Sequence, residues 1–132
     1  MKVKQLNPEP YKKIWDTRKA TITGFLKDKL VISTGNEIHF VAFEKILYVK
    51  ASSNYSLIYD TEGKSILTSK TLKYYEEQLL DKGFLRVHSG TLINMSKVKS
   101  IKRNGMYKII LENDIKIPVS RSYKEALFSN LF

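Results

Sequence analysis

The sequence predicts a mainly β fold, with antiparallel sheets, one internal helix and a short C-terminal helix. Short apolar segments alternate with turns rich in glycine, asparagine and serine along most of the chain. Residues 69–83 and the tail after residue 120 instead carry apolar residues at helical spacing. A length of 132 residues fits one domain with a sizeable core.

The first 25 residues are predicted to be a lead-in or linker, and residues 26–132 one domain. Asn7-Pro8-Glu9-Pro10 blocks regular structure, although Tyr11, Ile14 and Trp15 can form one amphipathic turn that docks on the body. From residue 26 the apolar pattern becomes dense and typical of strands.

The first half of the domain reads as two hairpins and a further strand. Residues 30–34 and 37–43 flank Gly35-Asn36, which predicts a two-residue hairpin. Residues 45–51 and 55–60 follow, separated by the polar Ser52-Ser53-Asn54. A turn at 61–64 then leads into a strand at 65–69.

A single helix is predicted between these strands and the next. Ser69 or Thr71 can cap its start, and Gly83 stands where a left-handed residue can end it. Its buried stripe is expected to contain Leu72, Tyr75, Leu79 and Leu80.

The second half returns to strands and ends in a helix. Asn104-Gly105 predicts a type I′ hairpin leading into a strand at 106–111, and 112–114 predicts another turn. Pro118 indicates an edge strand or a strand end. Ser122 and Glu125 have the spacing of a capping box for the terminal helix.

Charge is distributed unevenly. The net charge of +10 comes from 23 basic and 13 acidic residues, with an excess of five in residues 1–30 and six in residues 84–132. Such segments indicate a footprint for a polyanion, with solubility as the alternative. The chain has no cysteine, no apolar run long enough for a bilayer and no signal-peptide pattern. We therefore expect a soluble cytoplasmic protein with no membrane partner.

Catalysis has little support in the sequence. His88 cannot use its strand neighbour Ser89 as a nucleophile, because adjacent strand residues point to opposite faces. Glu76 and Glu77 diverge on a helix, and the carboxylates of 112–114 fit a solvated turn. We predict no enzyme activity, no metal site and no cofactor.

Three polar interruptions of the strand pattern are better candidates, for binding. They are Ser52-Ser53-Asn54-Tyr55, His88-Ser89-Gly90 and Val119-Ser120-Arg121-Ser122. Small polar residues with glycine suit a tight loop that approaches a ligand closely. Hydroxyls and amides at a helix start suit a phosphate, and an arginine fork pairs with guanine. The alternative is three ordinary loops, in which a serine merely caps a helix.

Basic and aromatic residues surround these interruptions. Lys97, Lys99, Lys102 and Arg103 form a cluster, in which Lys97 and Lys99 are predicted to share a strand face for phosphate contacts. A solvated edge that discourages aggregation is the alternative. Tyrosines can stack unpaired bases, as in RNA-binding sheets, but Tyr55 and Tyr59 alternate as packed strand residues do.

The ordered motifs resemble the LytTR family of DNA-binding domains in bacterial transcriptional regulators. The similarity runs from about residue 26 to residue 127. The motifs are Leu47-Tyr48-Val49 with Asn54-Tyr55, Thr71-Leu72, Phe84 with Arg86 and His88, Ile93-Asn94, and Pro118-Val119-Ser120-Arg121.

This resemblance implies an elongated β fold whose loops enter the major groove of double-stranded DNA. Base contacts are then expected at Asn54 or Tyr55, at Ser89 and at Arg121. Phosphate contacts are expected at His88, Lys97, Lys99, Lys102, Arg103, Ser120, Ser122 and Lys124. The resemblance further implies repeated sites, a bent duplex, a homodimer on DNA and a role as a response regulator of a two-component system. Residues 1–25 are too short for a receiver domain, so we expect a stand-alone regulator or an excised domain.

The chain departs from the family pattern at three places. The family usually has an acidic residue at Lys50, arginine or asparagine at Ser89, and often glycine within 112–114. The shorter serine side chain costs about 1–3 kcal/mol of discrimination at one base pair. These departures keep open a second function, a protein-interaction or dimerisation module on the same scaffold, and a third, single-stranded RNA binding.

Overall fold

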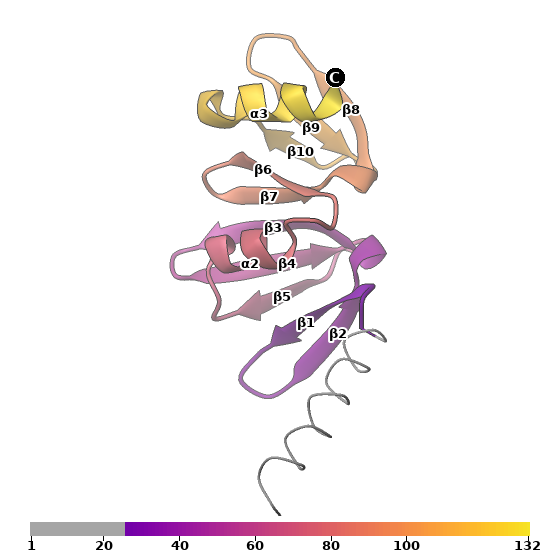
Figure 1. The fold of residues 1–132 in the computed structure, drawn as a ribbon, viewed down its shortest axis with the longest axis vertical. Helices are drawn as coiled ribbons and strands as arrows, with labels where there is room; N and C mark the ends of the chain where they lie inside the picture. The colour runs from indigo at the N-terminus through magenta and orange to yellow at the C-terminus, as the bar shows by residue number, and fades with distance from the viewer. Residues whose placement is uncertain (1–25) are drawn as a thin grey trace, which may run out of the picture.

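The computed structural model describes residues 26–132, which form three antiparallel sheets and two α-helices (Figure 1). The two-stranded sheet pairs β1 (Lys29–Ser33) with β2 (Ile38–Ala42). The five-stranded sheet has the order β5-β4-β3-β7-β6, with β3 (Ile46–Ser52), β4 (Tyr55–Asp60), β5 (Ser65–Thr68), β6 (Phe84–His88) and β7 (Thr91–Asn94). The three-stranded sheet has the order β10-β9-β8, with β8 (Val98–Lys102), β9 (Lys108–Leu111) and β10 (Lys116–Pro118).

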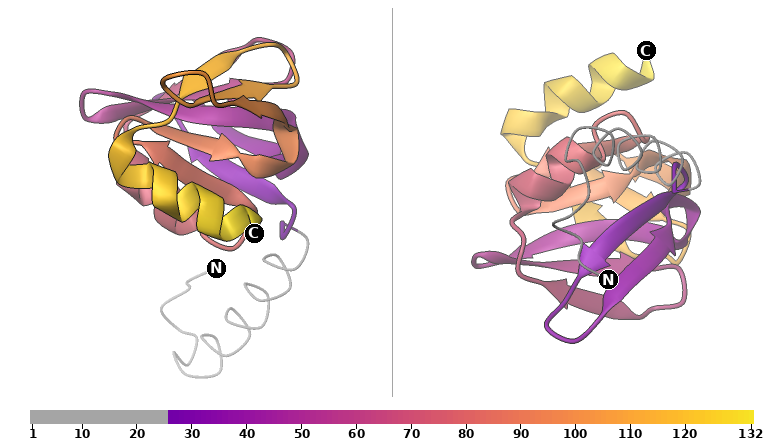
Figure 2. Two further views of the ribbon diagram at one scale, coloured as in Figure 1. Left: turned by 90° about the horizontal axis from the view of Figure 1, so that it is seen from above. Right: turned by 60° about the horizontal axis from the view of Figure 1, so that its bottom comes forward.

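Two helices and two short 3₁₀ turns connect the strands. The helices are α2 (Leu72–Gln78) and α3 (Arg121–Leu131), and the turns are η2 (Phe43–Lys45) and η3 (Met95–Lys97). The sheets follow one another along the longest axis of the molecule (Figure 1), and α2 and α3 lie on the same side of them (Figure 2). The predicted mainly β, elongated architecture is confirmed.

The five-stranded sheet carries a hydrophobic core on each face. Leu92 and Ile93 are neighbours on β7, so their side chains point to opposite faces. Leu92 belongs to the first cluster, which packs the sheet against α2 and β1, and Ile93 belongs to the second, which contains residues of the three-stranded sheet and α3. The central sheet therefore joins both halves of the molecule.

The helix α2 begins where its capping residue allows. The Thr71 side chain accepts a hydrogen bond from the Tyr74 N–H at 3.2 Å, which satisfies one free donor of the first turn. Leu72, Tyr75 and Leu79 are buried as predicted, whereas Leu80 is 77% exposed. Leu80 is exposed because the helix ends at Gln78 and the chain then turns toward Gly83, which has a φ of +83°.

Two predictions for the second half are wrong because tertiary contacts set the local structure. Asn104-Gly105 does not form a two-residue hairpin: Lys102 pairs with Lys108, which leaves a five-residue loop at 103–107. The Val119 N–H donates to the Tyr107 carbonyl at 2.9 Å, and the Tyr107 ring packs edge-on against Phe128. The hydrogen bond continues the β9–β10 pairing one residue beyond Pro118 and Lys108, and the ring contact holds Tyr107 toward α3.

The capping box at Ser122 and Glu125 is also absent. The helix α3 begins at Arg121 with Ser120 as its N-cap residue, so Ser122 lies inside the first turn. The cause is the backbone of Ser120, whose N–H donates to the Val87 carbonyl of β6 at 3.0 Å. This hydrogen bond keeps Ser120 in an extended conformation, so the helix begins at Arg121.

Lys97 and Lys99 do not share a strand face. Lys97 ends η3, and β8 begins one residue later at Val98. The pairing of β8 with β9 is irregular between Val98 and Ser100, so Lys99 is displaced from the regular alternation of this strand. The predicted turns at 35–36, 52–54 and 112–114 are confirmed, and so is the position of Pro118 at the end of an edge strand.

Candidate nucleic-acid interface

Three polar turns lie one above another along one edge of the molecule, at the left of Figure 1. The first turn joins β3 to β4, the second joins β6 to β7, and the third is the junction between β10 and α3. They contain the three polar interruptions identified in the sequence.

The first turn presents Asn54 at its tip. Ser52 pairs with Tyr55, so Ser53 and Asn54 alone make the reversal, and Ser53 takes a left-handed φ of +59°. Asn54 is exposed, and Tyr55 is 49% exposed at the start of β4. Both side chains are available to a ligand that approaches this edge.

The second turn is held by contacts to its own histidine and to β3. The Gly90 N–H donates to His88 Nδ1 at 3.1 Å, which fixes the histidine ring beside the turn. The Gly90 carbonyl accepts from the Ala51 N–H at 2.9 Å, next to the residues of the first turn. Ser89 remains exposed at the tip. The first two turns are therefore connected by a backbone hydrogen bond.

The third turn is connected to the second in the same way. The Ser120 N–H bond to Val87 ties the start of α3 to β6, close to the second turn. Arg121, Ser122 and Lys124 are exposed on the first turns of α3. The Ser120 Oγ is buried and has no hydrogen-bond partner within residues 26–132.

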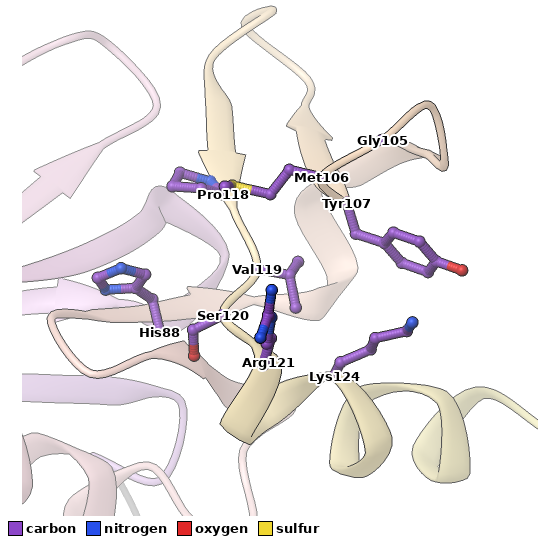
Figure 3. A pocket seen from close by; sticks show the side chains of 9 residues that line it. All are labelled: His88, Gly105, Met106, Tyr107, Pro118, Val119, Ser120, Arg121 and Lys124. Carbon is purple, nitrogen blue, oxygen red and sulfur yellow. The ribbon is translucent and has the colours of Figure 1, made fainter.

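A cavity of about 680 Å³ opens between the third turn and the loop at 103–107 (Figure 3). Two of its lining residues are in direct contact: the Lys124 ammonium lies 4.3 Å from the centre of the Tyr107 ring. The lining residues are His88, Gly105, Met106, Tyr107, Pro118, Val119, Ser120, Arg121 and Lys124. The cavity brings together four of the predicted contact residues: His88, Ser120, Arg121 and Lys124.

A second cavity, of about 360 Å³, shares His88 and Pro118 with the first. It adds two exposed lysines, Lys50 of β3 and Lys116 of β10. Of the described residues, none that lines either cavity carries a carboxylate. The sequence analysis predicts no contact for either lysine. Lys50 is one of the departures from the family pattern, and Lys116 carries no distinguishing signal in the sequence.

The remaining basic residues divide between the two ends of the strands. Lys102 ends β8 and Arg103 begins the loop that borders the first cavity, where the Arg103 guanidinium lies 5.6 Å from the Phe128 ring. Lys97 and Lys99 lie at the other end of β8. The chain reaches this end after it leaves β7 on the side away from the second turn. Lys99 pairs there with Asp114 at 3.1 Å. The structure thus does not place Lys97 and Lys99 with the three turns.

The tyrosines of β3 and β4 pack against one another. Tyr48 and Tyr59 stack with ring centres 4.5 Å apart, and burial together with the Tyr59 phenol raises the pKa of Tyr48. Their faces are thus partly occupied, as the packed-strand interpretation predicts. Among residues 26–132 no three histidine or acidic side chains gather as a metal site, and no helix is long and apolar enough to cross a membrane.

These features define a class, an antiparallel β domain with a cation-lined edge of short turns. Residues 36–132 match the family model of the LytTr DNA-binding domain, and the chain belongs to that family. It is similar to the sensory transduction proteins LytT of Bacillus subtilis and LytR of Staphylococcus epidermidis. With LytT it shares 34% identity over 101 residues, covering 75% of this chain and 42% of LytT. With LytR it shares 30% identity over 104 residues, covering 77% of this chain and 41% of LytR.

One solved structure has the same fold. It is the LytTr DNA-binding domain of a putative methyl-accepting/DNA response regulator from Bacillus cereus, with a TM-score of 0.68 and 22% identity. The match covers 79% of this chain and 96% of that one. The chain spans about two fifths of the length of the two relatives named above.

Proposed function

We propose that this domain binds double-stranded DNA selectively and acts in a bacterial transcriptional regulator of the response-regulator type. The observation that carries the proposal is the alignment of three exposed polar turns on one edge, connected by backbone hydrogen bonds. A rigid row of turns suits successive entries into the major groove, where base edges carry a distinct donor and acceptor pattern.

In this proposal the turn tips read bases and the surrounding cations bind phosphates. Asn54 or Tyr55, Ser89 and Arg121 contact base edges from the three turns. His88, Ser122 and Lys124 contact phosphates beside the second and third turns, with Lys102 and Arg103 above them. Ser120, which was also expected to contact a phosphate, leaves this set because its Oγ is buried and its N–H donates to Val87. Lys50 and Lys116 extend the same basic surface across the second cavity.

Lys97 and Lys99 remain in the proposal under one condition. Because they lie at the far end of the strands, phosphates reach them only when the duplex bends around the molecule. Bending also fits repeated sites occupied by two copies of the domain, as a homodimer on DNA. The setting we propose for this activity is the bacterial cytoplasm.

The decisive experiment is selection from a pool of random double-stranded DNA, followed by fluorescence anisotropy on the selected and random duplexes. We expect an enriched motif with two spaced half-sites, and binding that weakens as salt rises because counterions are released. Recovery of no motif, together with binding that does not respond to salt, would rule the proposal out.

A second candidate function, protein interaction or dimerisation, is favoured by the outer face of the β1–β2 hairpin. Val31, Ile38 and Phe40 are 43%, 62% and 54% exposed, and Val31 pairs directly with Phe40. Phe40→Ser and Ile38→Ser should abolish self-association measured by light scattering if this face forms a dimer. DNA affinity of the monomer should not change, which separates the two functions.

A further inference from the structure

Arg86 makes several contacts to the proposed interface, although the sequence analysis predicts no contact role for it. It lies on β6 with its side chain 19% exposed. Its Nη1 donates to Glu76 Oε1 of α2 at 2.9 Å, and its Nη2 donates to the Ser89 carbonyl at the tip of the second turn. Its Nε donates to the His88 carbonyl at 3.4 Å. All three nitrogens therefore have protein acceptors.

The same guanidinium also reaches the helix that carries Arg121. Its carbon atom lies 5.8 Å from the centre of the Tyr123 ring, within the range of a cation–π contact. The Tyr123 N–H donates to the Ser120 carbonyl at 3.1 Å, so this ring belongs to the first turn of α3. One side chain thus contacts α2, the second turn and the start of α3.

We propose that Arg86, held by Glu76, is a positioning residue that fixes Ser89 relative to Arg121. The inference rests on the proposed function, because it concerns two of the residues assigned to base contacts. A planar fork is needed here, since its fixed donors bind a carboxylate and two carbonyls at the same time. A lysine keeps the charge but presents one ammonium, which cannot replace three separate nitrogens.

This geometry separates positioning from direct DNA contact. Three of the five N–H donors of Arg86 are bonded within the protein and its side chain is 19% exposed, which leaves it fewer donors for a phosphate than an exposed arginine has. A pure positioning pair affects the selected sequence more than random DNA, because phosphate contacts tolerate a small displacement and base contacts do not. Removing Glu76 should then have the same effect as altering Arg86, although Glu76 is on another element.

The test compares Arg86→Lys and Glu76→Ala with the parent by anisotropy on the selected and random duplexes. Glu77→Ala is the matched control, because Glu77 is the exposed neighbour of Glu76 on α2 and its loss changes net charge equally. We expect Arg86→Lys and Glu76→Ala to lose about tenfold in affinity for the selected duplex, equal to about 1.4 kcal/mol. For random duplex, the affinity of Glu76→Ala should follow that of Glu77→Ala, and the affinity of Arg86→Lys, which keeps its charge, should follow that of the parent.

Two outcomes would overturn the inference. One is an equal loss of affinity on the selected and random duplexes for Arg86→Lys with no loss of selectivity in Glu76→Ala, which identifies Arg86 as a phosphate contact. The other is unchanged selectivity in both variants. If Arg86→Lys fails to fold, Glu76→Ala alone decides the result.

Amide hydrogen exchange gives a readout that does not depend on DNA. Both variants should exchange faster at residues 88–91 and 120–123 than the parent, while thermal unfolding remains cooperative. Unchanged exchange in these segments would contradict positioning. If the parent selects no motif, the proposed function fails, and the exchange rates still decide whether the pair orders the two turns.

Discussion

At the scale of single residues, the three turn tips differ in how well their side chains can discriminate between bases. Arg121 brings a charged fork that can bind guanine through two donors, whereas Ser89 offers one short hydroxyl. Both are exposed, and neither is needed for packing. The proposal therefore assigns most of the discrimination to the third turn.

Replacing Arg121 with alanine should reduce affinity for the selected duplex by about 1–3 kcal/mol and relax the preference at one base pair. Anisotropy on the selected and random duplexes measures both effects. Thermal unfolding provides the control, because an exposed residue on the first turn of α3 should leave stability within about 0.5 kcal/mol of the parent. An Arg121→Ala domain that binds the selected duplex as tightly as the parent would show that Arg121 does not read a base.

A second residue-scale prediction concerns buried Tyr75. Burial raises its pKa above the ordinary value of 10.0, more than the hydrogen bond with the Thr68 hydroxyl at 2.8 Å lowers it. The folded state thus keeps the proton that the unfolded state loses. The associated stability is complete below pH 10.0 and is lost as pH rises through the folded pKa.

Tyr75→Phe should lower the free energy of unfolding by about 0.5–1.5 kcal/mol at neutral pH, because a buried hydrogen bond is lost. The difference between variant and parent should shrink above pH 10.0. Urea unfolding at neutral and alkaline pH measures it. A difference that stays constant with pH would mean that Tyr75 does not contribute to alkaline unfolding.

At the scale of secondary-structure elements, Asn94 joins two segments that are distant in sequence. Its Nδ2 donates to the Phe43 carbonyl at 3.1 Å, at the start of η2, and to the Ile46 carbonyl at 2.9 Å, at the start of β3. Its Oδ1 accepts from the Ser96 N–H at 3.1 Å at the start of η3. This buried amide thus fixes β7 beside β3, and with it the spacing of the first two turns.

Asn94→Ala should lower the free energy of unfolding by about 1–3 kcal/mol, because buried carbonyls lose their partner. Chemical denaturation followed by circular dichroism measures the loss. Asn36→Ala is a suitable control, since Asn36 is exposed in the β1–β2 turn. Equal stability of the Asn94→Ala and control proteins would contradict this role.

At the scale of the whole molecule, the distribution of charge sets how the domain meets a polyanion. The net charge of +10 is not spread evenly, and the two cavities beside the turns are lined by basic residues without carboxylates among the described residues. The position of each cation relative to the turns should therefore decide its contribution to affinity. Lys102 and Lys97, at opposite ends of β8, make this comparison possible.

Lys102→Ala should weaken binding to every duplex equally and make the salt slope shallower by about one. Lys97→Ala should do the same only on DNA that bends around the molecule. Anisotropy across a series of salt concentrations, on straight duplexes and on duplexes with flexible central steps, measures both. If the affinity of the Lys102→Ala domain depends on salt as steeply as that of the parent, Lys102 does not contact a phosphate.

Much of this architecture could be predicted because local chemistry and tertiary structure agree. Gly35-Asn36 and Ser53-Asn54 make tight reversals wherever two strands can pair, and Thr71 caps a helix through its own hydroxyl. Predictions failed where a distant contact was stronger than the local signal. The Tyr107 ring packs against Phe128 of α3, and Asn104-Gly105 is part of a five-residue loop between β8 and β9.

The sequence by itself determined the strands, most of the turns, the two helices and the polar character of the three tips, because these depend on residues close together in the chain. Only the tertiary structure decided that the tips lie along one edge, since the strand order and the hydrogen bonds from Ala51 and Ser120 bring distant segments side by side. It also decided the contacts of Arg86, whose partners on α2 and α3 are set by packing and have no fixed spacing in sequence.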